Sequence, residues 1–493
     1  MRCSTFCRST ILLSALALLA ACGGGQSGPD WAVDHLTVPQ HPFLAPNGRS
    51  NMHNDAYMTD TYEVAGPEGE GAEVELARFA DGMHTCVTLA FDGQDRILTT
   101  SAEMLSFRIL LLHPDRLEIL SEYDLPPRDI SDPLFPYDDT SGAAYFVLDS
   151  QDRVVLSDAE NAVQVLAVSE SSGELELVRR YDLSAHVVPM EPPARDHVQM
   201  AIPDWSGKYL WFTTRYGKVG TLDRDSGAVR ATELEGEEIQ NSFAVGEDGV
   251  YIVSDHAMYR FSHDGAGAPA VDWRTAYDRG SRVKISNFNQ GSGTTPQLFG
   301  ELVAICDNAE PRMNVLFLRR ADGAEVARMP VFEDGLSTTE NGLPGLVRQG
   351  EHGLEYSVVV DNNYGIDRNA VLSAGRCWTE HAGGLVRVDL IPDASGAYAC
   401  RQVWQSAEKS SQVLPKLSLA NGLLYVYTYE WTEAEDYTWY LTGVDFETGQ
   451  TALRIPTGEG LDYANFGPPL TLGPDGSAYL GTMGGLVRVR DVP

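Results

Sequence analysis

Lysine and arginine are scarce in this sequence of 493 residues. It has 36 of them against 70 aspartates and glutamates, which gives a formal net charge of −34 at pH 7. Proteins that bind nucleic acids contact the phosphates through clustered Lys and Arg side chains. The composition therefore excludes nucleic acid as a partner, and it predicts an acidic, well-solvated surface without specifying a fold.

The common motifs of metal and catalytic sites are also missing. C-x-x-C and C-x-x-C-H do not occur, which excludes zinc-ribbon, thioredoxin-like and c-type haem proteins. H-E-x-x-H and G-x-S-x-G are absent too, so neither a zinc protease nor a serine hydrolase is indicated. Enzyme activity has no sequence motif behind it.

Few cysteines are available for disulfide bonds. Beyond residue 22, only Cys86, Cys306, Cys377 and Cys400 occur. The first two lie in apolar runs that are typical of strands, and we predict that they are buried thiols. Cys377 and Cys400 flank an expected hairpin, so in an exported protein we predict a disulfide bond between them.

Residues 1–21 have the pattern of an export signal. Arg2 and Arg8 precede an apolar run, Ile11–Ala20, that is too short to span a bilayer as a mature helix. The run ends in Leu19-Ala20-Ala21-Cys22, which resembles the lipobox of bacterial lipoproteins. This resemblance implies cleavage before Cys22 and lipidation of its thiol. The alternative is an ordinary secretory signal.

The lipoprotein resemblance also implies a location. Gly23 follows the cysteine at a position where retention in the inner membrane usually requires Asp. We therefore expect a lipid-anchored protein of the bacterial cell envelope, in the outer membrane. Residues 22–30 are predicted to be a flexible tether. Residues 31–71 lack a sustained period and are predicted to form an ordered N-terminal wrapping segment, where His53, Asp55 and Asp60 are either ligands or ordinary loop contacts.

A strand–turn–strand pattern repeats roughly every 50 residues from Glu73 onward. Each copy has two short apolar runs separated by a turn that contains Asp, Asn or Gly, and each run is too short for a helix. The copies are Thr88–Ala102, Tyr145–Ala159, Ala201–Thr214, Phe243–Asp255, Gln297–Asn308, Leu346–Asn363, Leu417–Tyr429 and Leu470–Thr482.

Repeats of this length that consist only of strands are typical of propeller blades, which must close into a ring to bury their faces. The fold class is therefore all-β, with residues 72–493 forming a single eight-bladed β-propeller of four-stranded antiparallel blades. The last copy has only three strands, and the strand-like run Ala72–Phe79 stands alone before the first. We predict that this N-terminal strand closes the eighth blade.

The blade ends resemble a known superfamily. Leu222–Val229 (LDRDSGAV) and Val444–Leu453 (VDFETGQTAL) are similar to the PQQ-like repeats of eight-bladed quinoprotein-like propellers. Membership would imply an oxidoreductase that uses PQQ. However, Leu453 stands where these enzymes usually carry a blade-end tryptophan, and no vicinal cysteine pair occurs. We therefore expect the fold without PQQ.

The loops that lead into the inner strand of each blade are the expected place for function, because loops can vary without disturbing the strands. Polar side chains at equivalent positions of these loops would form a ring around the central channel. Alternatively, they only satisfy backbone groups of their own loops. The candidates for ligand binding are His84, His197, Asn241, Thr294, Asn341, Ser411 and Asn465.

One loop has the alternating oxygen ligands of a calcium site. Asp361, Asn363 and Asp367 are spaced as in a calcium-binding loop, but the glutamate expected at the twelfth position is missing. Calcium is therefore the one cofactor that the sequence suggests, with an ordinary Asx turn as the alternative.

These observations together favour a binding or scaffold function. We expect a lipid-anchored cell-envelope propeller that binds a small ligand or another envelope protein and contacts the membrane through its N-terminal lipid. The alternative is an enzyme, either a quinoprotein-like oxidoreductase or a metal-dependent propeller hydrolase, that acts on a small sugar, alcohol or lactone.

Overall fold

Short strands separated by tight turns make up almost all of the regular structure, as the spacing of Gly and Asp predicts. The computed structural model describes residues 33–132, 139–367, 377–432 and 436–492. Within these ranges there is no α-helix, and the only helical turns are the 3-10 turns η1 (Ser184–His186) and η3 (Leu461–Tyr463). No helix in this described part is long and apolar enough to cross a membrane. The predicted lipidation site, Cys22, lies outside it.

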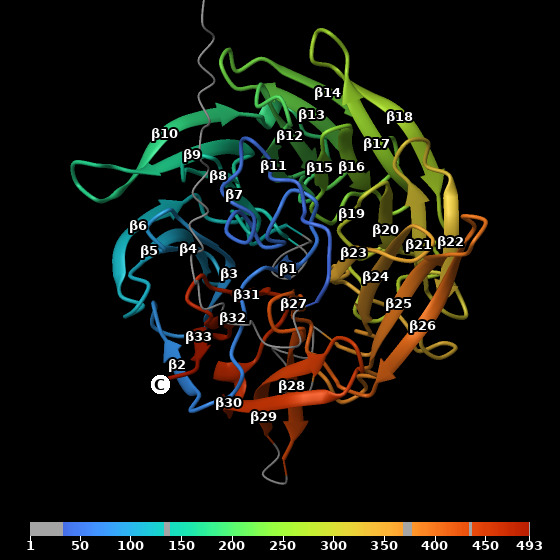
Figure 1. Ribbon diagram of the computed structural model, residues 1–493. Coiled ribbons are helices and arrows are strands. Elements are labelled where there is room, and N and C mark those ends of the chain that lie inside the picture. The colour runs from blue at the N-terminus through green and yellow to red at the C-terminus, as the bar shows by residue number, and fades with distance from the viewer. Residues whose placement is uncertain (1–32, 133–138, 368–376, 433–435, 493) are drawn as a thin grey trace, which may run out of the picture.

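The strands form eight four-stranded antiparallel blades around a central axis, which confirms the predicted fold (Figure 1). Blades 1 to 4 follow the chain in order. Blade 1 contains β3 (His84–Phe91), β4 (Ile97–Ala102), β5 (Phe107–Leu112) and β6 (Ile119–Leu125). Blade 2 contains β7 (Phe146–Leu148), β8 (Val154–Ser157), β9 (Ala162–Val168) and β10 (Leu175–Asp182). Blade 3 contains β11 (Val198–Pro203), β12 (Tyr209–Thr214), β13 (Lys218–Asp223) and β14 (Val229–Glu233). Blade 4 contains β15 (Ala244–Gly246), β16 (Gly249–Val253), β17 (Ala257–His263) and β18 (Pro269–Ala276).

The second half continues the ring. Blade 5 contains β19 (Gln297–Phe299), β20 (Leu302–Cys306), β21 (Asn314–Arg319) and β22 (Glu325–Pro330). Blade 6 contains β23 (Gly345–Gln349), β24 (Leu354–Asp361), β25 (Leu385–Pro392) and β26 (Tyr398–Ser406). Blade 7 contains β27 (Lys416–Ser418), β28 (Leu423–Trp431), β29 (Tyr437–Asp445) and β30 (Thr451–Glu459). Blade 8 contains β31 (Leu470–Leu472), β32 (Ala478–Thr482), β33 (Gly484–Arg490) and the N-terminal β2 (Glu73–Ala77).

The ring closes through β2, as the sequence predicts. β2 pairs antiparallel with β33, in a register that runs from Glu73 opposite Arg490 to Ala77 opposite Leu486. Blade 8 is also joined to blade 1, because β33 and β3 pair in parallel at His84 and Gly484. Both ends of the chain therefore contribute to one blade, and closure removes the exposed strand edges of an open ring.

Most of the predicted wrapping segment lies inside the ring, and the chain after β1 (Thr61–Tyr62) then runs outward to β2 (Figure 1). Residues 33–62, here called the plug, pair with the inner strands one after another. The carbonyls of Ala56 and Tyr57 accept hydrogen bonds from inner strands of blades 4 and 5, and the plug strand β1 pairs in parallel with β27. These bonds satisfy plug backbone groups that burial would otherwise leave without partners.

Buried charges fix the plug in place. Asp60 accepts hydrogen bonds from Lys416 Nζ of blade 7 and from Gln297 Nε2 of blade 5, the latter at 2.7 Å. His53 Nδ1 lies 3.0 Å from the same carboxylate, and Lys416 also donates to the carbonyl oxygen of Met52. The side chains of Lys416 and Asp60 are both inaccessible to solvent. His53, Asp55 and Asp60, the alternative ligands of the sequence, are thus buried parts of the fold.

Aromatic side chains connect neighbouring blades on the outside of the ring. Trp404 of β26 packs against Gly449 in the turn of blade 7, and its indole N–H donates to the Phe446 carbonyl at 2.8 Å. Trp273 of β18 contacts blade 5 in the same way and donates to the Arg320 carbonyl at 2.8 Å. Each indole therefore joins the outer strand of one blade to a turn of the next.

The prediction holds at the position after the turn, which carries no tryptophan in blade 7. The position after the turn of blade 7 is Leu453, but the tryptophans occur farther along the outer strands of blades 4 and 6. There the pairing shifts register, between Arg260 and Phe261 in blade 4 and between Arg387 and Val388 in blade 6. The pairing shifts register beside Leu453 too, between Gly443 and Val444, so outer strands with and without the tryptophan share such a β-bulge.

The structure also corrects the predicted disulfide bond, because Cys377 and Cys400 are both free thiols. Cys377 belongs to an apolar cluster of blades 7 and 8, whereas Cys400 packs against a cluster of blades 5 and 6. In the β25–β26 hairpin, Cys400 pairs with Leu390, near the turn and away from the end at Leu385 that follows Cys377. Cys86 and Cys306 are buried, as predicted.

Candidate functional site

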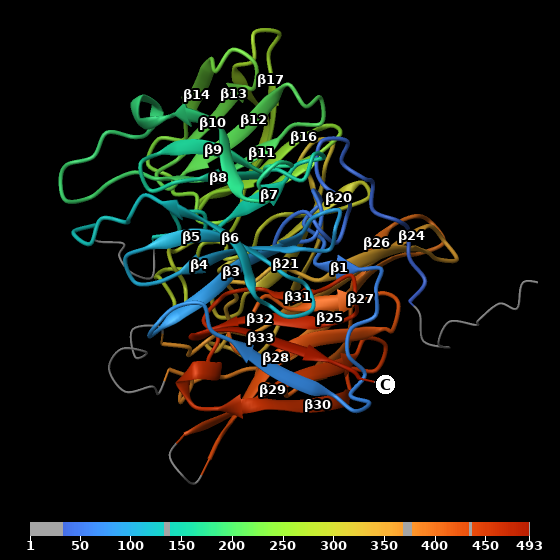
Figure 2. The same cartoon turned by 90° about the vertical axis from the view of Figure 1, so that its left-hand side faces the viewer.

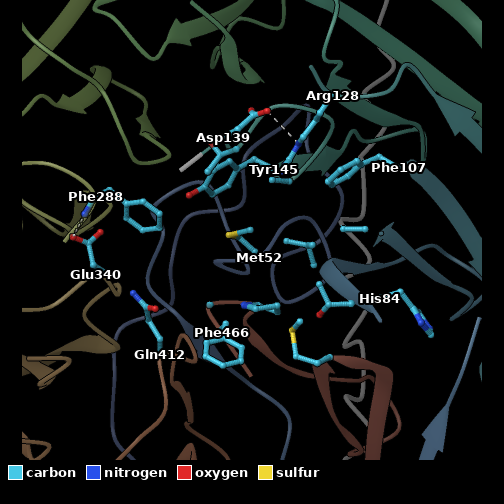
Figure 3. Close-up of a pocket in the computed structure, with 18 of the residues that line it drawn as sticks. Met52, His84, Phe107, Arg128, Asp139, Tyr145, Phe288, Glu340, Gln412 and Phe466 are labelled. Atoms are coloured by element: carbon cyan, nitrogen blue, oxygen red, sulfur yellow. Dashed lines mark hydrogen bonds and ion pairs between the residues drawn. The ribbon is translucent and has the colours of Figure 1, made fainter. Parts of the chain in front are cut away.

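A cavity of about 530 Å³ lies at one end of the central channel (Figure 3). The loops that lead into the inner strands form its wall, with contributions from every blade except blade 3 among the residues that line it. Met52 of the plug forms part of the floor, so the plug closes the channel beneath the cavity. Closure matters because a ligand pocket must bury most of the ligand surface, which an open channel cannot do.

Most of the wall is apolar and adaptable. Four methionines line the cavity, and Phe107, Phe288 and Phe466 add aromatic faces. Met83 and Met104 are 47% and 57% exposed, so their side chains remain accessible to a ligand. Methionine has an unbranched, polarizable side chain that can follow the shape of an apolar molecule. The four methionines are Met52, Met83, Met104 and Met483.

A few polar groups interrupt this lining. Glu340, Gln412 and Phe288 lie along one side of the cavity, with Tyr145 nearby (Figure 3). Glu340 Oε1 accepts a hydrogen bond from the Phe288 N–H at 3.1 Å. Burial, and then the charge of Glu340, raises the pKa of Tyr145 to about 12, so its hydroxyl keeps its proton. Gln412 is only 3% exposed, and its Oε1 has no hydrogen-bond donor among the described residues.

The one arginine of the wall is held by the protein. Arg128 lies over the Phe107 ring at 4.0 Å, donates to the Ser141 carbonyl at 2.7 Å and lies 3.5 Å from Asp139 (Figure 3). Burial lowers the pKa of Arg128, and the Asp139 carboxylate opposes that shift. This guanidinium therefore shapes the wall and is compensated by a carboxylate within it.

Three of the predicted ligand-binding residues line the cavity: His84, Asn241 and Asn341. Both ring nitrogens of His84 are used, because Nε2 accepts the Phe79 N–H at 2.9 Å while Nδ1 donates to the Gly82 carbonyl at 3.0 Å. This pattern requires the neutral imidazole.

Asn241 and Asn341 are also hydrogen-bonded within the wall. Asn241 Nδ2 donates to the Ser292 carbonyl at 3.0 Å, and Asn341 Nδ2 donates to Asp361 and to the Val413 carbonyl at 2.7 and 2.8 Å. In these bonds the two amides hold neighbouring loops together at the edge of the cavity.

The other four predicted ligand-binding residues are buried but do not line the cavity: His197, Thr294, Ser411 and Asn465. His197 Nε2 lies 2.9 Å from an Asp132 oxygen. Thr294 Oγ1 accepts the Cys306 N–H at 2.9 Å. Asn465 Nδ2 donates to the carbonyls of Pro468 and Gly481, and Ser411 Oγ lies 3.5 Å from Asn465 Oδ1. The structure thus places these four in contacts that hold the loops.

The predicted calcium loop has its oxygens engaged by the protein. Asp361 Oδ2 accepts hydrogen bonds from the amides of Asn341 and Asn363 at 2.7 and 2.8 Å, and Asn363 Oδ1 accepts the Glu340 N–H at 2.8 Å. Donor groups therefore occupy the positions that a cation would need, and Asp361 and Asn363 do not fit a calcium site in this arrangement. Asp367 is exposed. In the described ranges, no cluster of three or more His, Cys, Asp or Glu could hold a metal.

Sequence reasoning missed most of the cavity wall. It selected polar residues of the loops, whereas the wall depends on apolar residues such as Phe288 and Phe466 and on Met52 of the plug. One signal was present in the sequence: large apolar residues inside polar, glycine-rich loops, as in the stretch around Phe288. Such residues bury themselves in a cavity or against a ligand when no strand pattern explains them.

Comparison with known proteins gives similarity without a function. No family model matches the chain. An uncharacterised protein of Archaeoglobus fulgidus is 25% identical over 312 residues, which cover 56% of this chain and 58% of that protein. The match thus spans less than two thirds of the relative's length.

The similar solved structures are propellers. BamB from Moraxella catarrhalis is 16% identical with a TM-score of 0.35, over 66% of this chain and 93% of that one. The WD40 domain of SCAP from fission yeast is 9% identical with a TM-score of 0.47, over 85% and 98%. Virginiamycin B lyase from Staphylococcus aureus, solved with quinupristin, is 8% identical with a TM-score of 0.39, over 85% and 100%. These likenesses concern the fold alone.

Proposed function

We propose that this propeller is a binding protein that holds a small, largely apolar ligand in the channel-end cavity. The observation that carries the proposal is the cavity itself: about 530 Å³, closed below by the plug and lined by methionine and phenylalanine together with polar and charged side chains. Ligand sites typically combine such a volume and lining with a small number of orienting polar groups.

Binding explains the lining better than catalysis does. His84, the histidine of the wall, uses both ring nitrogens in hydrogen bonds to the backbone, so it is not poised to accept a proton from a substrate. The exposed thioethers of Met83 and Met104 supply contact area and no acid or base.

We further propose that a lipid on Cys22 anchors the protein to the bacterial envelope, with the cavity facing away from the membrane. The first described residue, Val33, donates its N–H to the Leu419 carbonyl, just beyond the end of β27. Gln412, which lines the cavity, lies before the start of the same strand. The chain thus enters the ring at the end opposite to the cavity. Figure 2 shows the ring from the side, with the start of the described chain and the C-terminus on the same side.

A fluorescent apolar probe tests the binding proposal. N-phenyl-1-naphthylamine should bind the purified protein saturably, at one site per molecule. Ala144 lines the cavity, so Ala144→Trp should fill part of it and weaken binding by at least about tenfold. Ala266→Trp is the matched control, because Ala266 lies exposed in the turn between β17 and β18. Equal affinity in the two variants, or no saturable binding, would reject the proposal.

A further inference from the structure

The charged groups of the cavity wall carry information about the ligand. Three carboxylates line the cavity, those of Glu103, Asp139 and Glu340, against the single guanidinium of Arg128 among the described lining residues. The imidazole of His84 is neutral in its hydrogen-bonded state. The lining residues thus carry more negative than positive charge, although Arg108 outside the lining lies 3.5 Å from Glu103, and the formal net charge of the whole protein is −34.

The guanidinium of Arg128 is positioned to compensate the carboxylate of Asp139, and it is not free to bind an anionic ligand. Arg128 lies 3.5 Å from Asp139, donates to the Ser141 carbonyl and has one face covered by Phe107. An anionic ligand would have to displace these contacts, and it would enter a cavity that the carboxylate of Glu340 also lines. Repulsion between like charges is stronger beside protein than in bulk water, because the effective dielectric constant is lower there.

The groups around Glu340 suit a cation. Its carboxylate lies beside Phe288, with Tyr145 farther along the wall (Figure 3). Aromatic faces attract a positive charge through the ring quadrupole. The nearby Gln412 Oε1 is buried and has no donor among the described residues, and such an acceptor is costly unless a ligand donates to it. An ammonium group supplies both the charge and the N–H donors.

We infer, on the basis of the proposed binding function, that the ligand is an amphipathic cation. Its ammonium group lies against Glu340 and Gln412 and its apolar body lies along the methionines and Phe466. The two parts of the ligand correspond to the two parts of the wall. The electrostatic field of the whole acidic protein adds to this preference by concentrating cations near the surface.

Three probes of similar size test the inference: 4-phenylbutylammonium, the neutral 5-phenylpentan-1-ol and the anionic 5-phenylpentanoate. Calorimetric titration of the purified full-length protein should show that it binds the ammonium probe at least about tenfold more tightly than the alcohol. Its affinity for the carboxylate probe should be lower still. Added salt should reduce the affinity for the ammonium more than that for the alcohol.

Glu340→Gln keeps the oxygen that accepts the Phe288 N–H, so the loop should stay folded. In this variant the preference for the ammonium over the alcohol should fall to within about threefold, while the alcohol binds as in the wild type. The control is Glu351→Gln, an exposed acid in the turn at the other end of blade 6.

The outcomes separate the two proposals. Suppose that all three probes bind, that Ala144→Trp weakens their binding, and that the alcohol or the carboxylate binds as tightly as the ammonium. The cavity is then a ligand site, and the cation inference is wrong. If no probe binds, or if Ala144→Trp leaves their affinities unchanged, the proposed function fails and the cation inference fails with it.

Discussion

At the scale of single residues, the most consequential contact is the buried ion pair that holds the plug. Lys416 and Asp60 are both inaccessible to solvent. Burial lowers the pKa of Lys416, and the Asp60 carboxylate opposes that shift. Removing one partner of such a pair leaves a buried charge uncompensated, which is far more costly than losing an exposed pair.

The first prediction concerns this pair. Asp60→Asn should lower the free energy of unfolding by about 3 kcal/mol, because Lys416 would keep its buried charge without its partner. Glu118→Gln is the control, since Glu118 and its partner Arg116 are 61% and 56% exposed, and it should change stability by less than about 1 kcal/mol. Urea unfolding of both variants measures the difference. Equal effects would mean that the pair does not fix the plug.

A second residue-scale prediction concerns pH. Burial raises the pKa of Asp361 from 3.8 to about 6, against the lowering effect of hydrogen bonds from Asn341, Asn363 and Thr339. The folded protein thus holds this proton more tightly than the unfolded chain. The stabilisation is complete below about pH 3.8 and is lost as the pH rises through about 6.

Asp361→Asn removes this titration. From pH 4 to pH 7, the stability of the wild type relative to the variant should therefore fall by up to about 3 kcal/mol. Urea unfolding at several pH values measures this, with Glu351→Gln as a control that should follow the wild type throughout. A difference between wild type and Asp361→Asn that does not change with pH would contradict the assignment.

At the scale of elements, the outer strands depend on aromatic contacts between blades. A Cβ atom added to Gly449 would lie 2.5 Å from the Trp404 ring, and the φ of Gly449 is +72°. Gly173 has a similar φ of +78°, but nothing lies within 4 Å of an added Cβ. Comparing alanine substitutions at the two glycines therefore distinguishes the energetic cost of backbone strain from that of disturbed packing between blades.

Gly173→Ala should lower the free energy of unfolding by about 1 kcal/mol, the cost of placing an alanine in a left-handed backbone conformation. Gly449→Ala should cost about 1–3 kcal/mol more, because the Trp404 ring must also shift. Thermal or urea unfolding of the two variants measures the difference. If both variants lose the same stability, the tryptophan contact does not contribute to the cohesion of the ring.

Strands could be predicted from the sequence where neighbouring residues alone determine where they begin and end. Turn formers between short apolar runs predict β31 to β33 correctly, and the missing fourth strand of the last copy predicts β2. The plug could not be predicted in this way, because its conformation is set by inner strands that lie far away in sequence. Leu298 of β19 and Leu417 of β27, for example, donate backbone hydrogen bonds to it. The tryptophans could not be assigned from the turn motif, because Trp273 and Trp404 lie farther from the turn along their outer strands than Leu453 does in blade 7.

The candidate site was less predictable than the fold. The loops were identified correctly as the face on which a cavity could form, and His84, Asn241 and Asn341 line it. The selection of polar side chains was less informative, because Asn465 and Thr294 use their hydrogen bonds to hold their own loops. The apolar wall arises only when distant loops converge with Met52 of the plug, and no local pattern encodes that convergence.

At the scale of the whole molecule, the proposed membrane anchor depends on lipidation of Cys22, the cysteine at the end of the predicted export signal. Cys22→Ala should abolish incorporation of labelled palmitate and should release the protein from membranes into the soluble fraction. Cys86→Ala is the matched control, because Cys86 is buried within β3, and it should leave lipidation unchanged. Palmitate incorporation in Cys22→Ala equal to that of the wild type would contradict the anchor.

The central claim is that the channel-end cavity holds a ligand, and native mass spectrometry of the protein purified from its own cells tests it most directly. We predict a wild-type species that carries one additional small molecule, which Ala266→Trp retains and Ala144→Trp loses. A bound molecule that Ala144→Trp keeps at the wild-type level would place the ligand elsewhere and contradict the account.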